Sequence, residues 1–212
     1  MESLEMAATE ENDSQSRGIL FASKDECIYT KCFCEENVWK MCESIRKRIP
    51  SELEKCYAVV LSNPNRTIPL WEQIASDDPE DPVVWDYHVI FLHVTDGDGS
   101  HVYDLDTRLS FPTSVATYVD KAFLHEDRRL ATKYHRYFRV IPAEVYLEKF
   151  ASDRSHMRTS SGEWQQPPPE YPCIKTDDCN HNLDDFISME KSVGCGDVYS
   201  YTEFVAHFLP DR

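Results

Sequence analysis

The chain of 212 residues is poor in glycine and contains no long apolar run. Its six glycines are too few and too scattered for a glycine-rich loop that would hold a phosphate group. No stretch approaches the roughly 20 consecutive apolar residues that a membrane-spanning helix requires. We therefore expect neither a nucleotide-binding loop nor a membrane-embedded protein.

Basic residues are also scarce, because 22 Lys and Arg stand against 38 Asp and Glu, a formal net charge of -16. A chain with this charge repels phosphate backbones and anionic lipid surfaces. The composition therefore predicts no nucleic-acid partner and no membrane partner. It favours a substrate that is neutral or cationic.

The eight cysteines contain no C-x-x-C pair; they are Cys27, Cys32, Cys34, Cys42, Cys56, Cys173, Cys179 and Cys195. The first seventeen residues are acidic and polar and do not resemble a signal peptide, so we expect that the protein is not secreted. Its cysteines are therefore expected to be reduced thiols. The nearest approach to a zinc motif, Cys27, Cys32 and Cys34, lacks a second ligand pair. At least one thiol could therefore serve as a free nucleophile.

The organisation of the chain predicts an α+β fold. Residues 1–20 lack hydrophobic periodicity and aromatic residues, which indicates a disordered acidic leader, and residues 21–212 are expected to form a single domain. After Cys34, apolar residues recur every three or four positions up to Pro50, which predicts an amphipathic helix. Helices and strands then mix without βαβ alternation, so we expect a mainly antiparallel sheet.

The remaining expected elements follow from turn and capping signals. We predict strands over 57–62, 68–73 and 137–141, helices over 113–124, 142–150 and 200–209, and a loop-rich segment over 151–181. Thr113 is expected to cap the first of these helices. Ser51 with Glu54, and Ser200 with Glu203, have the spacing of a capping box.

A hairpin is expected over residues 83–106, where two β-rich runs flank the turn-like residues 95–100. A three-residue turn over 95–97 would place His88 directly opposite Asp104. If the register slips by two residues, His88 still shares a face with Asp104 or Asp106, because strand side chains alternate with period two.

These residues supply the groups of a cysteine nucleophile. Cys34 lies at the expected start of a helix, where the helix dipole and the free backbone N–H groups favour the thiolate form of its side chain. The same N–H groups could donate hydrogen bonds to an oxyanion. The negative charges of Glu35 and Glu36 disfavour the thiolate. His88 would take the thiol proton and Asp104 would orient the ring. Taken singly, each is more often a structural residue, and only their conjunction favours catalysis.

Several longer segments resemble one family, the protein N-terminal glutamine amidohydrolases. They are Cys32–Lys40 (CFCEENVWK), Val84–Val89 (VWDYHV), Tyr103–Thr107 (YDLDT) and Phe150–Met157 (FASDRSHM), together with Pro167–Pro169 and Asn182–Met189. The likeness extends from Cys27 to Phe208.

The resemblance implies a monomeric enzyme without a cofactor that converts an N-terminal glutamine of a protein or peptide to glutamate and releases ammonia in the N-degron pathway. It also implies an architecture similar to the papain and transglutaminase superfamily, a cytoplasmic location with the nucleus as a second compartment, and a catalytic triad. Carried over by motif, the triad is Cys34, His88 and Asp104.

An enzyme specific for a chain end must detect the free α-ammonium group. Asp86, Asp106 and Asp153 are candidates by charge alone, and each can equally be structural. Three other functions fit the same residues: a cysteine peptidase, a transglutaminase-like acyl transferase, and a non-catalytic acidic interaction module.

Overall fold

A computed structural model describes residues 18–95, 99–124 and 127–210. Most of the predicted leader, residues 1–17, and the hairpin-turn residues 96–98 therefore lie outside the described residues. Leu20, at the end of the predicted leader, is buried, and its amide donates a hydrogen bond of 2.9 Å to the Tyr103 hydroxyl. The packed part of the chain thus begins before residue 21.

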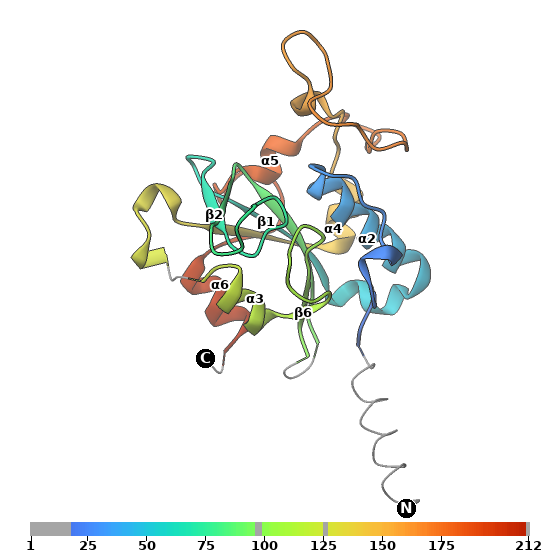
Figure 1. The fold of residues 1–212 in the computed structure, drawn as a ribbon. Coiled ribbons are helices and arrows are strands. Elements are labelled where there is room, and N and C mark those ends of the chain that lie inside the picture. Colours follow the sequence, from blue (N-terminus) through green and yellow to red (C-terminus); the bar gives the residue numbers. More distant parts are fainter. Residues whose placement is uncertain (1–17, 96–98, 125–126, 211–212) are drawn as a thin grey trace, which may run out of the picture.

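An antiparallel sheet of six strands forms the centre of the described chain (Figure 1). In spatial order its strands are β6 (Thr113–Ser114), β5 (His101–Tyr103), β4 (His88–His93), β1 (Cys56–Ser62), β7 (Tyr137–Pro142) and β8 (Asp197–Ser200). A second, two-stranded sheet pairs β2 (Ile68–Leu70) with β3 (Val83–Trp85). This mixed architecture confirms the predicted α+β class and the mainly antiparallel sheet.

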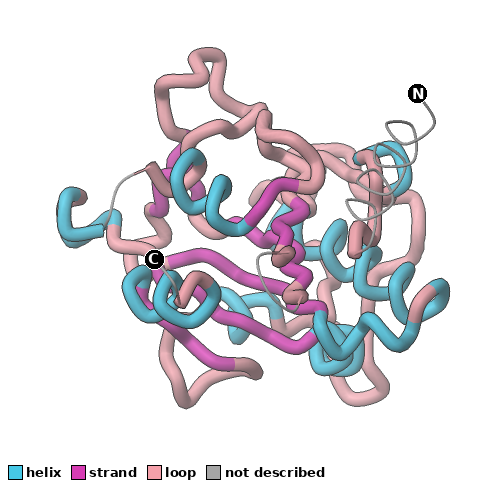
Figure 2. Tube along the Cα trace, turned by 90° about the horizontal axis from the view of Figure 1, so that it is seen from below, coloured by secondary structure: helices cyan, strands magenta, loops and turns pink. Residues whose placement is uncertain are grey.

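Helices cover both faces of the sheet (Figures 1 and 2). One face packs against α2 (Cys34–Arg48), α4 (Ala143–Lys149) and α5 (Leu183–Ile187), and the other against α3 (Val115–Lys121) and α6 (Tyr201–Phe208). Along β1, Ala58 and Val60 belong to the first core, whereas Val59 and Leu61 belong to the second. Because both faces are buried, β1 has a continuous apolar run instead of an alternating pattern.

The helix α2 confirms the expected pattern. Val38, Met41, Cys42 and Ile45 are all buried on its sheet-facing side. The helix ends two residues before Pro50, which begins a 3₁₀ turn. Its first turn places Cys34 at the edge of the core, beside the start of β4.

The predicted hairpin is present as β4 and β5, but its first run is divided, because Val83–Trp85 forms β3 of the second sheet, and its register differs from the predicted one. Phe91 pairs with Tyr103 and His93 with His101, so the pairing is shifted by two residues from the expected one. Continued along the ladder, it would place Asp106, not Asp104, opposite His88. The side-chain face is retained because the shift is even.

Helix capping agrees with the sequence in one of three places. Ser200 and Glu203 form the predicted capping box at α6. Ser114, not Thr113, caps α3, by accepting a hydrogen bond from the Thr117 amide. Ser51 does not cap a helix. The 3₁₀ turn there begins at Pro50, so Ile49 occupies the N-cap position and Ser51 lies inside the turn.

The loop-rich segment 151–181 leaves the body of the molecule beside α4 and returns at α5, and is drawn in orange in Figure 1. Its regular structure is a 3₁₀ turn, Ser155–Met157, and isolated bridges such as Ser152 with Ile174. Among the described residues, no helix has both the length and the apolar character needed to cross a membrane.

Candidate active site

A cavity of about 480 Å³ lies where the start of α2 meets β4 and the segment 151–181. It is lined by Cys32, Cys34, Arg66, Trp85, Asp86, Tyr87, His88, Asp106, His156, Met157, Gln165, Gln166, His181, Leu183, Asp184 and Ile187. Cys34 and His88, predicted from distant parts of the chain, therefore share one cavity. A volume of this size is typical of a small-molecule or side-chain binding site.

His88 and Asp104 form a buried hydrogen-bonded pair. The Nε2 atom of His88 lies 3.0 Å from Oδ1 of Asp104. The other carboxylate oxygen, Oδ2, accepts hydrogen bonds from the Tyr118 hydroxyl (2.7 Å) and the Gln73 amide (3.3 Å). The predicted proximity of His88 and Asp104 is confirmed, while Tyr118 and Gln73 were not recognised in the sequence.

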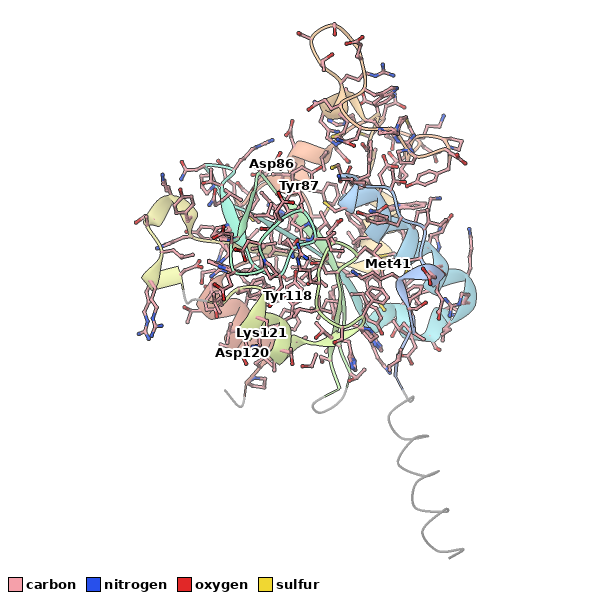
Figure 3. The ribbon with its side chains drawn as sticks, in the orientation of Figure 1. Met41, Asp86, Tyr87, Tyr118, Asp120 and Lys121 are labelled. Atoms are coloured by element: carbon pink, nitrogen blue, oxygen red, sulfur yellow. The ribbon has the colours of Figure 1, made fainter. Side chains whose placement is uncertain are left out.

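Figure 3 labels Tyr118 on α3 and places Asp86 and Tyr87 together at the end of the sheet where β4 begins. Asp104 follows directly after β5. The pair is therefore held between a helix on one face of the sheet and the end of a central strand, which fixes its geometry.

The pair stabilises charge on both partners. Burial alone would raise the pKa of Asp104, but the His88 ring and the hydrogen bonds from His88, Tyr118 and the Asp106 amide lower it to about 2. Burial lowers the pKa of His88, and the charge and hydrogen bond of Asp104 outweigh this and raise it. His88 is therefore a stronger base than an ordinary histidine.

The second ring nitrogen of His88 is available for chemistry. Nδ1 is buried and has no hydrogen-bond partner among the described residues. Trp85 stacks on the ring, with centroids 5.4 Å apart and an interplanar angle of 17°. Since Nε2 is held by Asp104, the ring offers Nδ1 for proton transfer.

Cys34 lies at the first position of α2 and is partly exposed. Its thiol donates to Oε2 of Glu35 at 3.7 Å. Burial and the negative charges of Glu35 and Asp106 raise the pKa of Cys34 well above its ordinary value, against a hydrogen bond from the Val89 amide. Before substrate binds, the sulfur is thus a neutral thiol that must transfer its proton in order to react.

The two glutamates after Cys34 are buried and have partners, which the sequence did not reveal. Glu36 forms a two-fold ion pair with Arg154, with Nε–Oε1 and Nη2–Oε2 distances of 2.8 Å. Glu35 accepts a hydrogen bond from the Tyr87 hydroxyl at 3.0 Å, and His156 lies 3.4 Å from its other oxygen. The signal lay in the FASDRSHM segment, which carries both Arg154 and His156.

The three aspartates considered for the α-ammonium group occupy different places. Asp106 lines the cavity and is largely buried, Asp86 lines it but is exposed, and Asp153 is not among the lining residues. Asp153 pairs with His181 at 3.0 Å. Only Asp106 combines burial with a position in the cavity.

The residues that come nearest to a metal-binding group in the described chain are His88, Asp104 and Asp106, with ligand atoms within 4.8 Å of one another. Nε2 of His88 and Oδ1 of Asp104 are already bonded to each other, and Oδ2 of Asp104 is occupied by Tyr118 and Gln73. The arrangement therefore fits a hydrogen-bonded acid–base pair better than an open coordination site. In the described ranges, Cys27, Cys32 and Cys34, whose spacing the sequence already made a weak zinc motif, do not bring their sulfur atoms together as a ligand group.

A helix-start cysteine beside a buried histidine–carboxylate pair supplies the groups used by thiol-dependent acyl-transfer enzymes. Residues 29–208 match the family model described as N-terminal glutamine amidase. The chain belongs to this family, a class of hydrolases that act on carbon–nitrogen bonds.

Curated relatives agree with the family match. The protein N-terminal glutamine amidohydrolase of Bos taurus is 53% identical over 185 residues, which cover 87% of this chain and 88% of that protein. The Danio rerio protein of the same name is 50% identical over 199 residues, 94% and 98% of the two chains. The Homo sapiens protein is 51% identical over 185 residues, which cover 87% of this chain and 89% of that protein.

Proposed function

We propose that this chain hydrolyses the side-chain amide of an N-terminal glutamine in proteins and peptides, leaving glutamate and releasing ammonia. The observation that carries this proposal is that Cys34 and His88 line one cavity while His88 is hydrogen-bonded to the buried Asp104, all inside the region that matches the family model. The match to relatives of this name supports the choice of substrate.

The proposed reaction is acyl transfer through a thioester. His88 accepts the Cys34 proton at Nδ1, and the thiolate attacks the side-chain carbonyl carbon of glutamine. The Cys34 amide, at the first helical position and without a helical acceptor, donates to the oxyanion. The tetrahedral intermediate collapses as His88 protonates the departing ammonia. A water molecule activated by His88 then hydrolyses the thioester, which releases glutamate and restores the thiol.

Further proposals follow from the family resemblance. We infer that the chain acts as a monomer without a cofactor, that its product enters the N-degron pathway, and that it works in the cytoplasm with the nucleus as a second compartment. We also infer an architecture related to the papain and transglutaminase superfamily. Gel filtration tests the monomer, cell fractionation tests the location, and superposition on members of that superfamily tests the architecture.

The activity is tested with a peptide that begins with glutamine and carries a second glutamine inside. We expect ammonia release and the small mass gain of an amide-to-acid conversion at the first residue only. Cys34→Ala should abolish it, whereas Cys173→Ala, which alters an exposed thiol outside the cavity, should not. Equal conversion of both glutamines would contradict the proposal.

The same experiment separates the alternative functions. A cysteine peptidase would shorten the peptide, and an acyl transferase would attach an added amine to the glutamine side chain. A non-catalytic interaction module would leave the peptide unchanged. Each outcome gives a different mass.

A further inference from the structure

An N-terminal glutamine carries a charged group very near its reacting atom. Four covalent bonds separate the α-nitrogen from the side-chain carbonyl carbon, so the two atoms are no more than about 5 Å apart. When Cys34 attacks that carbon, the α-ammonium group must therefore lie in the same cavity. An acceptor that recognises it has to line that cavity as well.

Most carboxylates near Cys34 already have partners. Glu35 does not line the cavity, and its oxygens face the Cys34 thiol, Tyr87 and His156. Asp104 is saturated by the hydrogen bonds of the buried pair. Asp104 has no oxygen left for a cationic ligand. Oε1 of Glu35 accepts no hydrogen bond among the described residues, but it is buried, faces His156 at 3.4 Å and belongs to a residue outside the cavity lining.

Two other acidic residues of the cavity are solvent-exposed. The Asp184 side chain is 74% exposed and pairs with Arg66 at 2.6 Å. Asp86 is exposed, and its Oδ1 accepts the Tyr87 amide at 2.9 Å. A water-exposed carboxylate gives little discrimination for an ammonium group, because solvent screens the interaction.

Asp106 differs from all of these. It is largely buried, and one of its oxygens lies within 4.8 Å of a ring nitrogen of His88. The Tyr29 hydroxyl donates to its Oδ1 at 2.6 Å, and its own amide donates to Asp104 at 2.9 Å. In the part of the chain that the structure describes, no hydrogen bond reaches its Oδ2.

We propose that Asp106 binds the α-ammonium group of the substrate through Oδ2 and so restricts the reaction to glutamine at a chain end. This inference rests on the proposed function and adds the residue that makes it specific. Tyr29 fixes the carboxylate in position. An internal glutamine has an amide nitrogen in place of the ammonium group and would bring no positive charge to Oδ2, so Asp106 would keep only the nearby charges of His88 and Lys24.

The same contact would also favour the nucleophile. The negative charge of Asp106 is one of the causes that raise the pKa of Cys34. An ammonium group placed against Asp106 offsets this charge, so the correct substrate promotes formation of the thiolate that attacks it.

The experiment compares two peptides that differ only in the α-amino group: one begins with glutamine, and the other begins with its des-amino analogue, a glutaric acid monoamide. For the wild-type protein we expect kcat/KM to be about 100-fold higher for the glutamine peptide, because a site whose carboxylate pairs with a charged group of the ligand discriminates against a ligand that lacks this group. In Asp106→Asn this ratio should fall close to one, mainly through KM. Asp86→Asn, in the same cavity wall, is the matched control and should keep the wild-type ratio.

The ratio distinguishes recognition from an indirect effect on His88. If Asp106 acted only through His88, D106N would slow both peptides equally and preserve the ratio, which would overturn the inference. A wild-type protein that converts both peptides equally, or a ratio that collapses in D86N instead, would overturn it as well. If D106N does not fold, D106E displaces the carboxylate by one methylene and should lower the ratio at least about tenfold; an unchanged ratio in D106E would then overturn it.

Failure of the proposed function has a separate signature. A wild-type protein that releases no ammonia from the glutamine peptide would refute the function, and this inference with it. An active wild-type protein with a preserved ratio in D106N would refute the role of Asp106 alone.

Discussion

The Nε2 atom of His88 lies 3.0 Å from Oδ1 of Asp104, and both side chains are buried. Asp104→Asn keeps the shape of this contact but removes the charge that raises the pKa of His88, so burial alone would then lower that pKa. The variant loses both a strong base and the carboxylate that stabilises the imidazolium. We expect kcat for ammonia release to fall by about 10²–10⁴-fold.

The measurement is a pH–rate profile with a glutamine-initiated peptide. Asp77→Asn, which changes an exposed carboxylate in a loop, is the control and should retain wild-type rates. A D104N variant with wild-type kcat would show that the pair has only a structural role.

Asp104 also links stability to acid pH. Its pKa in the folded protein is about 2, below the ordinary value of 3.8, so the folded state binds fewer protons than the unfolded state between these values. The contribution of Asp104 to the free energy of unfolding is therefore complete above about pH 4 and is lost as the pH falls towards 2. The shift corresponds to about 2 kcal/mol of unfolding free energy.

Titration of the side-chain carboxyl carbons by NMR measures this pKa in the folded protein. The signal that is missing in D104N belongs to Asp104, and its midpoint in the wild-type protein should lie near pH 2. A midpoint near 3.8 would contradict the assignment of the low pKa to Asp104.

The candidate triad could be predicted because each residue carries a local signal. Cys34 begins an amphipathic pattern that ends at a proline, and His88 and Asp104 lie in two β-rich runs joined by a turn. The two-residue error in register did no harm, since an even shift keeps side chains on the same face. The shared face of His88 and Asp104 followed from the predicted hairpin together with the period of two, although the exact opposite residue was wrong.

Other parts of the site depend on contacts between distant segments, which periodicity does not encode. Arg154 lies 118 positions after its partner Glu36, and neither residue type is usually buried. Tyr118 reaches Asp104 from the opposite layer of the molecule. The short helix α5 and the strand β8 were missed for a related reason: each is four or five residues long and is held by tertiary packing more than by its own propensity.

The ion pair of Glu36 and Arg154 predicts a large loss of stability on removal of one partner. Both side chains are buried, and the pair joins the first turn of α2 to the segment 151–181. Glu36→Gln leaves the guanidinium buried without a counterion, so we expect a loss of about 3–5 kcal/mol in unfolding free energy. Urea denaturation provides the measurement.

A surface pair on the same helix is the matched control. Glu43 and Lys47 are 2.9 Å apart, but the Lys47 side chain is 66% exposed. Glu43→Gln should cost less than about 1 kcal/mol. The double variant Glu36→Met with Arg154→Met should recover part of the loss, because no unpaired charge remains; a single variant as stable as the wild type would contradict the burial of the pair.

Glu35 is expected to restrain the reactivity of Cys34. Its carboxylate accepts the thiol at 3.7 Å, and its charge is the main contribution after burial that raises the pKa of Cys34. Glu35→Gln preserves the shape and can still accept from Tyr87, but it removes the charge. The pKa of Cys34 should fall, so more thiolate is present at a given pH, and alkylation of Cys34 by iodoacetamide near pH 7 should become at least about threefold faster.

Mass spectrometry of the peptides that contain Cys34 and Cys173 gives both rates from one sample, and the exposed Cys173 serves as the internal reference. Glu144→Gln, on the exposed side of α4, is the control for a general change in charge and should leave the Cys34 rate unchanged. Equal Cys34 rates in E35Q and the wild type would contradict the electrostatic role of Glu35. If the rate rises as expected, the carboxylate keeps Cys34 protonated until His88 removes its proton, so the thiolate forms where the substrate carbonyl is already in place.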